Sequence, residues 1–170
     1  MIWLLVIALA QLACHRQPVL PVWTNLDTGD AFSPPYEVFH SGQRRVVNNC
    51  ASAIAAVREG FEPRNPVDYA PLRLAALQCQ AQQLVASARP SITTHWNAAD
   101  SVPSSLLSGD GWQSKASAAA HGDFNGDSLE DRLFSVEEWP AQGTARRVRF
   151  LLLEKKSPAA TPALLRELTW

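Results

Sequence analysis

The stretch HGDFNGDSLEDR, residues 121–132, places four acidic residues and an asparagine within nine positions. Carboxylates this close repel one another, so the chain needs an interaction that offsets the repulsion. Two interpretations account for the stretch: an acidic turn exposed to water, or a loop that surrounds a bound cation. The stretch also divides the sequence, because a helical hydrophobic period precedes it and a strand-like alternation follows it.

The residues after this stretch are predicted to form an antiparallel sheet. Residues 131–139 and 146–156 have the composition of strands, and a glycine in the connection between them permits a hairpin. Residues 163–170 are expected to add a third strand. Glu137 and Glu138 are neighbours on the first of these strands, so their side chains point to opposite faces and cannot act as a carboxylate pair.

Two helices are predicted before the acidic stretch. The first lies within residues 46–63, where Asn48 or Asn49 can cap the start because its side-chain oxygen accepts an unpaired backbone N–H. The second lies within residues 65–90 and ends at Pro90. Four residues fall on one face of the first helix: Cys50, Ile54, Val57 and Phe61.

Cysteine placement predicts a disulfide between the two helices. Cys50 and Cys79 both lie on faces that the helices are expected to bury. In an oxidising compartment a bridge between them closes a loop of about 30 residues and stabilises the fold by roughly 3–4 kcal/mol. The alternative is two separate buried thiols in a reducing compartment. Because the chain lacks a CxxC motif and its histidines are scattered, we do not expect a zinc site.

The first 14 residues, MIWLLVIALAQLAC, resemble an export signal. Their apolar run, residues 2–10, is shorter than the roughly 20 residues of a membrane-spanning helix. One interpretation has Cys14 lipidated as the first residue of a bacterial lipoprotein. A second has cleavage after the small-x-small pattern at 8–10, which frees a soluble periplasmic protein starting at Gln11. A buried N-terminal strand is the third.

The acidic stretch has the spacing of a calcium cage. Numbered from Asp123, the oxygen-bearing side chains stand at positions 1, 3, 5 and 9, and a backbone carbonyl stands near position 7. The expected ligands are Asp123, Asn125, Asp127, the carbonyl of Leu129, and Asp131. Hard oxygen ligands in a flexible loop suit Ca²⁺, which takes six to eight of them, better than Mg²⁺, which demands octahedral geometry.

This loop resembles the calcium loop of FG-GAP and VCBS-type repeats, written D-x-[DN]-x-D-G-x-x-D before a strand. An EF-hand needs a bidentate glutamate at position 12, where this chain has Phe134. The resemblance covers residues 121–152 in a single copy, and Ser128 replaces the usual glycine. Such repeats build propeller blades in extracellular proteins, and similar loops occur singly in small bacterial lipoproteins. A catalytic metal keeps an open position with a general base nearby, and nothing in the sequence indicates either, so we expect a structural ion rather than a catalytic one.

The order of the elements, helices followed by strands, indicates an α+β fold. We expect a disulfide-linked helical pair followed by a small antiparallel β-sheet with a calcium-binding loop. Short strands are expected near residues 19–23 and 36–40, and residues 91–114 are expected to be mostly loop. Four regions are predicted along the chain: a signal peptide at 1–13, a tether with short strands at 14–42, a helical region at 43–110 and the hairpin region at 111–170.

No catalytic motif stands out, so we expect a binding protein and not an enzyme. The nucleophile elbow, HExxH, phosphate-loop and dinucleotide patterns are all missing. A hydrolase would need a cleft that gathers His95 with Asp100 or Glu137, and His121 is expected to be a surface residue beside the acidic loop. Three tryptophans are expected to fill the core rather than to form a binding patch: Trp112, Trp139 and Trp170.

Charge and export together narrow the expected partners. A formal net charge of −1 argues against a nucleic-acid binder, which would carry a basic patch. We expect a protein on the periplasmic face of the bacterial envelope, held to the membrane by its lipid anchor. Its expected partner is a secreted toxin or cell-wall hydrolase, as for an immunity or inhibitor protein. The alternative is a structural or adhesive envelope component that assembles through its β-region.

Overall fold

The computed structural model describes residues 22–23, 35–65 and 69–169. The predicted signal peptide, Cys14 and Trp170 therefore lie outside the described residues. Neither helix in the described ranges is both long and apolar enough to cross a membrane. The elements are β1 (Val22–Trp23), β2 (Tyr36–His40), β3 (Gln43–Val47), α1 (Cys50–Arg58), β4 (Glu62–Pro63), α2 (Tyr69–Ala86), the 3₁₀ helix η2 (Ser104–Leu106), β5 (Trp112–Gly122), β6 (Asp131–Pro140), β7 (Arg147–Glu154) and β8 (Ala163–Leu168).

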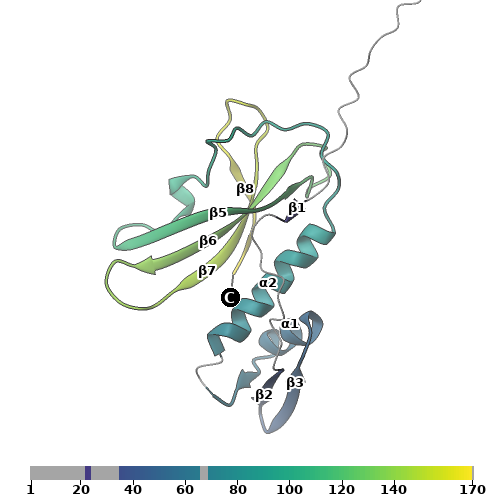
Figure 1. Cartoon of the computed structure of the whole chain (residues 1–170), viewed down its shortest axis with the longest axis vertical. Coiled ribbons are helices and arrows are strands. Elements are labelled where there is room, and N and C mark those ends of the chain that lie inside the picture. Colours follow the sequence, from purple (N-terminus) through teal and green to yellow (C-terminus); the bar gives the residue numbers. More distant parts are fainter. Residues whose placement is uncertain (1–21, 24–34, 66–68, 170) are drawn as a thin grey trace, which may run out of the picture.

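These elements form two antiparallel sheets, which confirms the α+β class. The larger sheet has the strand order β1-β5-β6-β7-β8, and the smaller has the order β3-β2-β4. Helix α2 extends between them, as Figure 1 shows. The acidic stretch connects β5 to β6, the two longest strands of the larger sheet.

Helix α2 covers one face of the larger sheet with its C-terminal half. Leu77, Ala81 and Val85 recur at every fourth position and pack on Leu133 and Phe150. Two adjacent small residues of β5, Ala119 and Ala120, belong to the same buried cluster. This packing buries a continuous apolar stripe of the helix, which is the main source of helix stability in a folded protein.

The opposite face of the larger sheet is covered by the irregular segment between α2 and β5. Trp96 and Val102 from this segment pack on Phe134, Val136 and Leu151. Strands β6 and β7 are therefore apolar on both faces, since Leu133 and Phe134 belong to different clusters. A sheet buried on both faces holds its connecting loops at fixed positions, including the acidic stretch.

The smaller sheet has its own core, shared with both helices. Val38 of β2 and Val47 of β3 pack with Ala53 of α1. Leu72 and Ala76, from the first half of α2, complete this cluster. The same helix thus contributes to the cores of both sheets and joins them into one structure.

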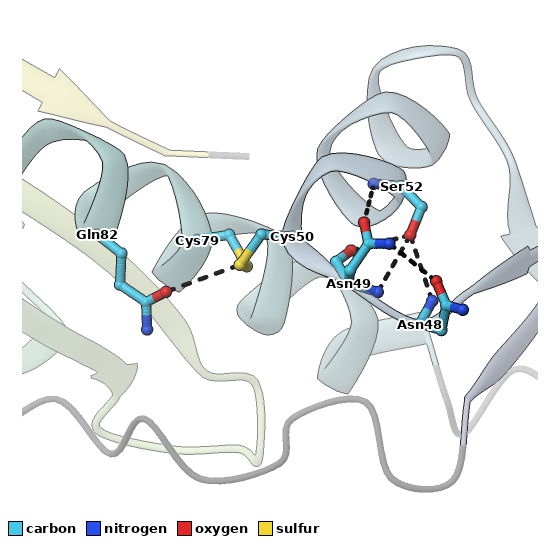
Figure 2. The surroundings of a disulfide bond; sticks show 6 residues. All are labelled: Asn48, Asn49, Cys50, Ser52, Cys79 and Gln82. Carbon is cyan, nitrogen blue, oxygen red and sulfur yellow. Dashed lines mark hydrogen bonds between the residues drawn. A yellow bond between two sulfur atoms is a disulfide. The ribbon is translucent and has the colours of Figure 1, made fainter. Parts of the chain in front are cut away.

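Helix α1 begins with the predicted asparagine cap and is linked to α2 by the predicted disulfide. The side chain of Asn49 accepts the backbone N–H of Ser52 at 2.9 Å, and the Ser52 hydroxyl oxygen accepts the backbone N–H of Asn49 at 3.2 Å. Figure 2 shows this reciprocal cap beside the Cys50–Cys79 bridge. The Cα atoms of the two cysteines are 5.3 Å apart, so the disulfide prediction is confirmed.

Most strand predictions are confirmed, but one long strand was not predicted. The short strand β2 spans the expected residues, and β6, β7 and β8 lie where the alternation places them. Strand β5, in contrast, begins at Trp112 inside the segment 91–114 that is expected to be mostly loop. Its Ala- and Ser-rich sequence has weak strand propensity. Pairing with β6 from Trp112 to Gly122, interrupted only by an irregularity between Ala118 and Ala120, supplies the missing stabilisation. Similarly, β3 occupies Val46 and Val47, which the helical interpretation included.

Candidate metal site

The acidic loop is attached at both ends to the segment that follows α2. Asp123 and Arg89 exchange two backbone hydrogen bonds, of 2.8 and 2.9 Å. At the other end, the backbone N–H of Glu130 donates to the Thr93 carbonyl at 2.7 Å. The fold therefore holds the backbone of the loop in place at both ends.

Inside the loop the acidic side chains accept hydrogen bonds from the backbone that coils around them. Asp123 Oδ1 accepts the N–H of Gly126 at 2.6 Å, and its Oδ2 accepts that of Ser128 at 2.9 Å. Asp127 Oδ1 accepts the N–H of Leu129 at 2.9 Å. These bonds fix the conformation of the loop and the positions of the Asp123 and Asp127 carboxylates.

Asp131 is the least satisfied of the acidic residues in the loop. Its side chain is fully buried, and Oδ2 accepts the backbone N–H of Phe124 at 2.9 Å. The second oxygen, Oδ1, is buried and has no hydrogen-bond partner among the described residues. A buried carboxylate oxygen without a partner is costly, and most such atoms in native proteins are paired with protein, water or an ion.

The electrostatic surroundings of Asp131 also favour a cation. Burial raises the pKa of Asp131 to about 7, and repulsion from Asp127, Asp123 and Glu154 adds to the rise. The hydrogen bond from Phe124 acts in the opposite direction. A divalent ion bound here would give Oδ1 a partner and would offset the charge of the neighbouring carboxylates.

The predicted ligands thus lie in one loop, but they are not arranged as a complete coordination shell. No group of three or more His, Cys, Asp or Glu side chains within the described ranges is placed to hold a metal ion. Asn125 Nδ2 donates to Asp127 Oδ2 at 3.3 Å, and Leu129 forms an isolated bridge to Thr93. Coordination therefore requires a rotation of side chains within the loop. The buried free oxygen of Asp131 fits a cation nonetheless.

Ser128 adopts a backbone conformation that favours glycine. Its φ of 69° lies in the left-handed region, which costs a residue with a Cβ atom roughly 1–2 kcal/mol.

We predict that Ser128→Gly raises the free energy of unfolding by about 0.5–1 kcal/mol, because glycine relieves this strain but loses more chain entropy on folding. Urea unfolding measures the change. Ser128→Ala keeps the strain and is the control; an equal gain in both variants would contradict this explanation.

A second cluster of charges, which was not predicted from the sequence, lies on the far side of the sheet from α2. Glu138 is fully buried, and its carboxylate accepts hydrogen bonds from Arg147 at 2.6 Å and Arg149 at 2.9 Å. The backbone N–H of Ser108 donates to it at 2.8 Å. Burial opposes ionisation, but the bonds from Arg149, Arg147 and Ser108 prevail and lower the pKa of Glu138 to about 2. This group holds the 104–108 segment to the sheet.

The remaining candidate residues take other roles. Asp100 Oδ2 lies 2.6 Å from the Nζ of the buried Lys155. Glu137 is exposed whereas Glu138 is buried, in agreement with the prediction that their side chains point to opposite faces. His121 Nδ1 is buried without a hydrogen-bond partner in the described part of the chain, 4.0 Å from Glu130 Oε2.

The prediction that Trp112 fills the core is wrong, because this residue is 40% exposed. Strand β5 carries it to a pairing position opposite Pro140, at the end of the β5–β6 pair that lies away from the acidic loop. The indole of Trp139 donates to Gln113 at 2.8 Å and is only partly buried. Among the tryptophans whose side chains are described, Trp96 is the buried one, and its indole N–H donates to the Glu130 carbonyl at 2.7 Å.

The chain matches no protein-family model, and neither the curated proteins nor the solved structures give a significant match. The similarity of residues 121–152 to FG-GAP and VCBS-type loops accordingly stays a prediction from the motif.

Proposed function

We propose that the protein is an exported binding protein of the bacterial envelope whose loop 123–131 holds a structural Ca²⁺ ion. The observation that carries the proposal is the buried, unpartnered Oδ1 of Asp131 among further carboxylates. Oxygen is the ligand type that Ca²⁺ takes, and its flexible geometry tolerates a loop of mixed side chains. The ion would fix the β5–β6 connection.

Export and lipid attachment are part of the same proposal. The bridge between Cys50 and Cys79 suits an oxidising compartment, where disulfides form and persist. With these two cysteines paired, Cys14 is the one cysteine of the sequence left for lipid attachment. We expect radiolabelled palmitate to be incorporated into the wild type and not into Cys14→Ser. A wild type that carries no label would contradict the anchor.

Ca²⁺ is expected to stabilise the protein. At a free Ca²⁺ concentration 100 times the dissociation constant, the free energy of unfolding should rise by about 2.7 kcal/mol relative to protein in chelator. Urea unfolding in the two conditions measures the difference. Asp131→Asn is the matched variant, since it keeps the size of the side chain but removes the charge, and it should show little of this gain. If the wild type has the same midpoint of urea unfolding with and without Ca²⁺, the proposed Ca²⁺ site is refuted.

For the partner, we propose a secreted toxin or cell-wall hydrolase that the protein neutralises. Ile92 supports a protein contact near the loop: it is 55% exposed, and its backbone N–H donates to the Ser128 carbonyl at 3.0 Å. A loop held by Ca²⁺ would therefore hold this apolar side chain in place. Capture from envelope extract in Ca²⁺, followed by inhibition of the purified partner, would support the proposal. If Ile92→Ser inhibits the partner as strongly as the wild type does, Ile92 is not part of the contact.

The second candidate function is a structural or adhesive component that assembles through its sheet. Strand β8 pairs with β7 alone among the described strands, and Leu164 and Leu165 on it are 41% and 36% exposed. An open strand edge with apolar side chains favours pairing with another chain. Size-exclusion chromatography in Ca²⁺ and in chelator distinguishes the candidates, because a monomer in Ca²⁺ excludes self-assembly.

A further inference from the structure

The pairing of β6 with β7 brings a carboxylate from outside the loop next to Asp131. In this antiparallel register Leu133 pairs with Leu152, and Arg132 pairs with Leu153. Extending this register by one position places Asp131, the first residue of β6, opposite Glu154, the last residue of β7. Residues directly opposite one another project on the same face, and like charges in this arrangement are destabilising.

The side chain of Glu154 also contacts the loop directly. Its Oε2 accepts a hydrogen bond of 3.3 Å from Asn125 Nδ2, the same amide nitrogen that donates to Asp127. Only 14% of this side chain is exposed. Glu154 is also one of the groups whose charge raises the pKa of Asp131. A mostly buried glutamate thus lies near a buried aspartate whose Oδ1 has no hydrogen-bond partner among the described residues.

We propose that Glu154 is a further ligand of the ion, supplied by β7 and not by the loop motif. The inference rests on the calcium site proposed above and adds a residue to it. With Glu154, the oxygen-bearing groups are Asp123, Asn125, Asp127, the Leu129 carbonyl, Asp131 and Glu154. Six groups reach the range of six to eight oxygens that Ca²⁺ takes. The ion then links the β5–β6 loop to the end of β7.

The ion pair between Glu154 and Lys156 is a weak competitor for the proposed ion. Lys156 Nζ lies 3.4 Å from Glu154 Oε1, and the lysine side chain is 69% exposed. Exposed ion pairs of this kind contribute little to stability, because water screens the charges and the long side chain loses freedom. Replacing this ion pair by a bound divalent ion would therefore cost little stability.

Calorimetric titration with Ca²⁺ tests the assignment. Glu154→Gln keeps the size of the side chain and its ability to accept from Asn125, but loses the charge. We expect its dissociation constant for Ca²⁺ to be at least about tenfold larger than that of the wild type, since even groups outside the first ligand shell change metal affinity by this amount. Glu137→Gln, which removes an exposed charge from the same sheet, should bind like the wild type.

Unfolding experiments on the same variants separate a ligand from a structural residue. In chelator, Glu154→Gln should be at least as stable as the wild type, because it removes the repulsion with Asp131; in Ca²⁺ it should be less stable. An equal loss of stability in both conditions, or an unchanged dissociation constant, would overturn the assignment of Glu154 and leave the loop site standing. Failure of the wild type to bind Ca²⁺ would remove the site itself.

Discussion

Glu138→Ala is expected to destabilise the protein by about 3–5 kcal/mol, the range found when one partner of a buried ion pair is removed. Without the glutamate, Arg149 keeps its charge while its side chain is only 11% exposed. The backbone N–H of Ser108 also loses its acceptor. The segment that covers this face of the sheet should therefore loosen, and urea unfolding should show a large loss.

The adjacent residue provides a matched control. Glu137 lies on the same strand but faces solvent, so Glu137→Ala should change the free energy of unfolding by less than about 0.5 kcal/mol. The pH dependence gives a second measure of Glu138. Its pKa is about 2 in the folded protein against 4.5 ordinarily, so its contribution is present above pH 4.5 and is lost as the pH falls toward 2. Equal effects of the two alanine variants would contradict this role.

Removing the disulfide should have the second largest effect. The cysteines are 29 residues apart in sequence, and a closed loop of this length stabilises a fold by roughly 3–4 kcal/mol on the loop-entropy model. Helix α1 has nine residues, too few to be stable alone, so it depends on this link and on its packing. The double variant Cys50→Ala/Cys79→Ala should lose this amount in urea unfolding.

Reduction gives an independent test of the same bond. Dithiothreitol should lower the stability of the wild type to nearly that of the double variant and should leave the double variant unchanged. Cys79 is buried, so part of any loss in the variant comes from packing, and the reduced wild type isolates the effect of the bond. A double variant as stable as the oxidised wild type would show that the bridge adds nothing to the fold.

The parts of the fold that depend on local pattern could be predicted from the sequence. Asn49 caps α1 because its side chain accepts a hydrogen bond from the backbone N–H of Ser52, three residues further along the chain. A signal of this kind is local and can be recognised in the sequence. Strand β5 has no such signal: its Ala118–Ala120 segment is neutral, and β6 and α2 impose the extended conformation. Tertiary contacts decide such segments, and a pattern read along the chain does not contain them.

The same distinction applies to the charged sites. The loop spacing predicted Asp123, Asn125, Asp127 and Asp131 together because one turn of chain carries them all. Glu154, in contrast, comes near the loop through the register of β6 and β7. The buried cluster around Glu138 depends on the same register, which pairs Glu138 with Arg147. Pairing between strands has to be known before either contact can be expected.

The most direct test of the calcium site is a calorimetric titration of chelator-stripped protein with Ca²⁺ at pH 7.5, compared with Asp131→Asn. We predict that the wild type binds one ion per chain and that Asp131→Asn, still folded by circular dichroism, binds it far more weakly. Saturable binding that is unaffected by Asp131→Asn would place the ion elsewhere. Absence of any saturable binding in the wild type would contradict the calcium site altogether.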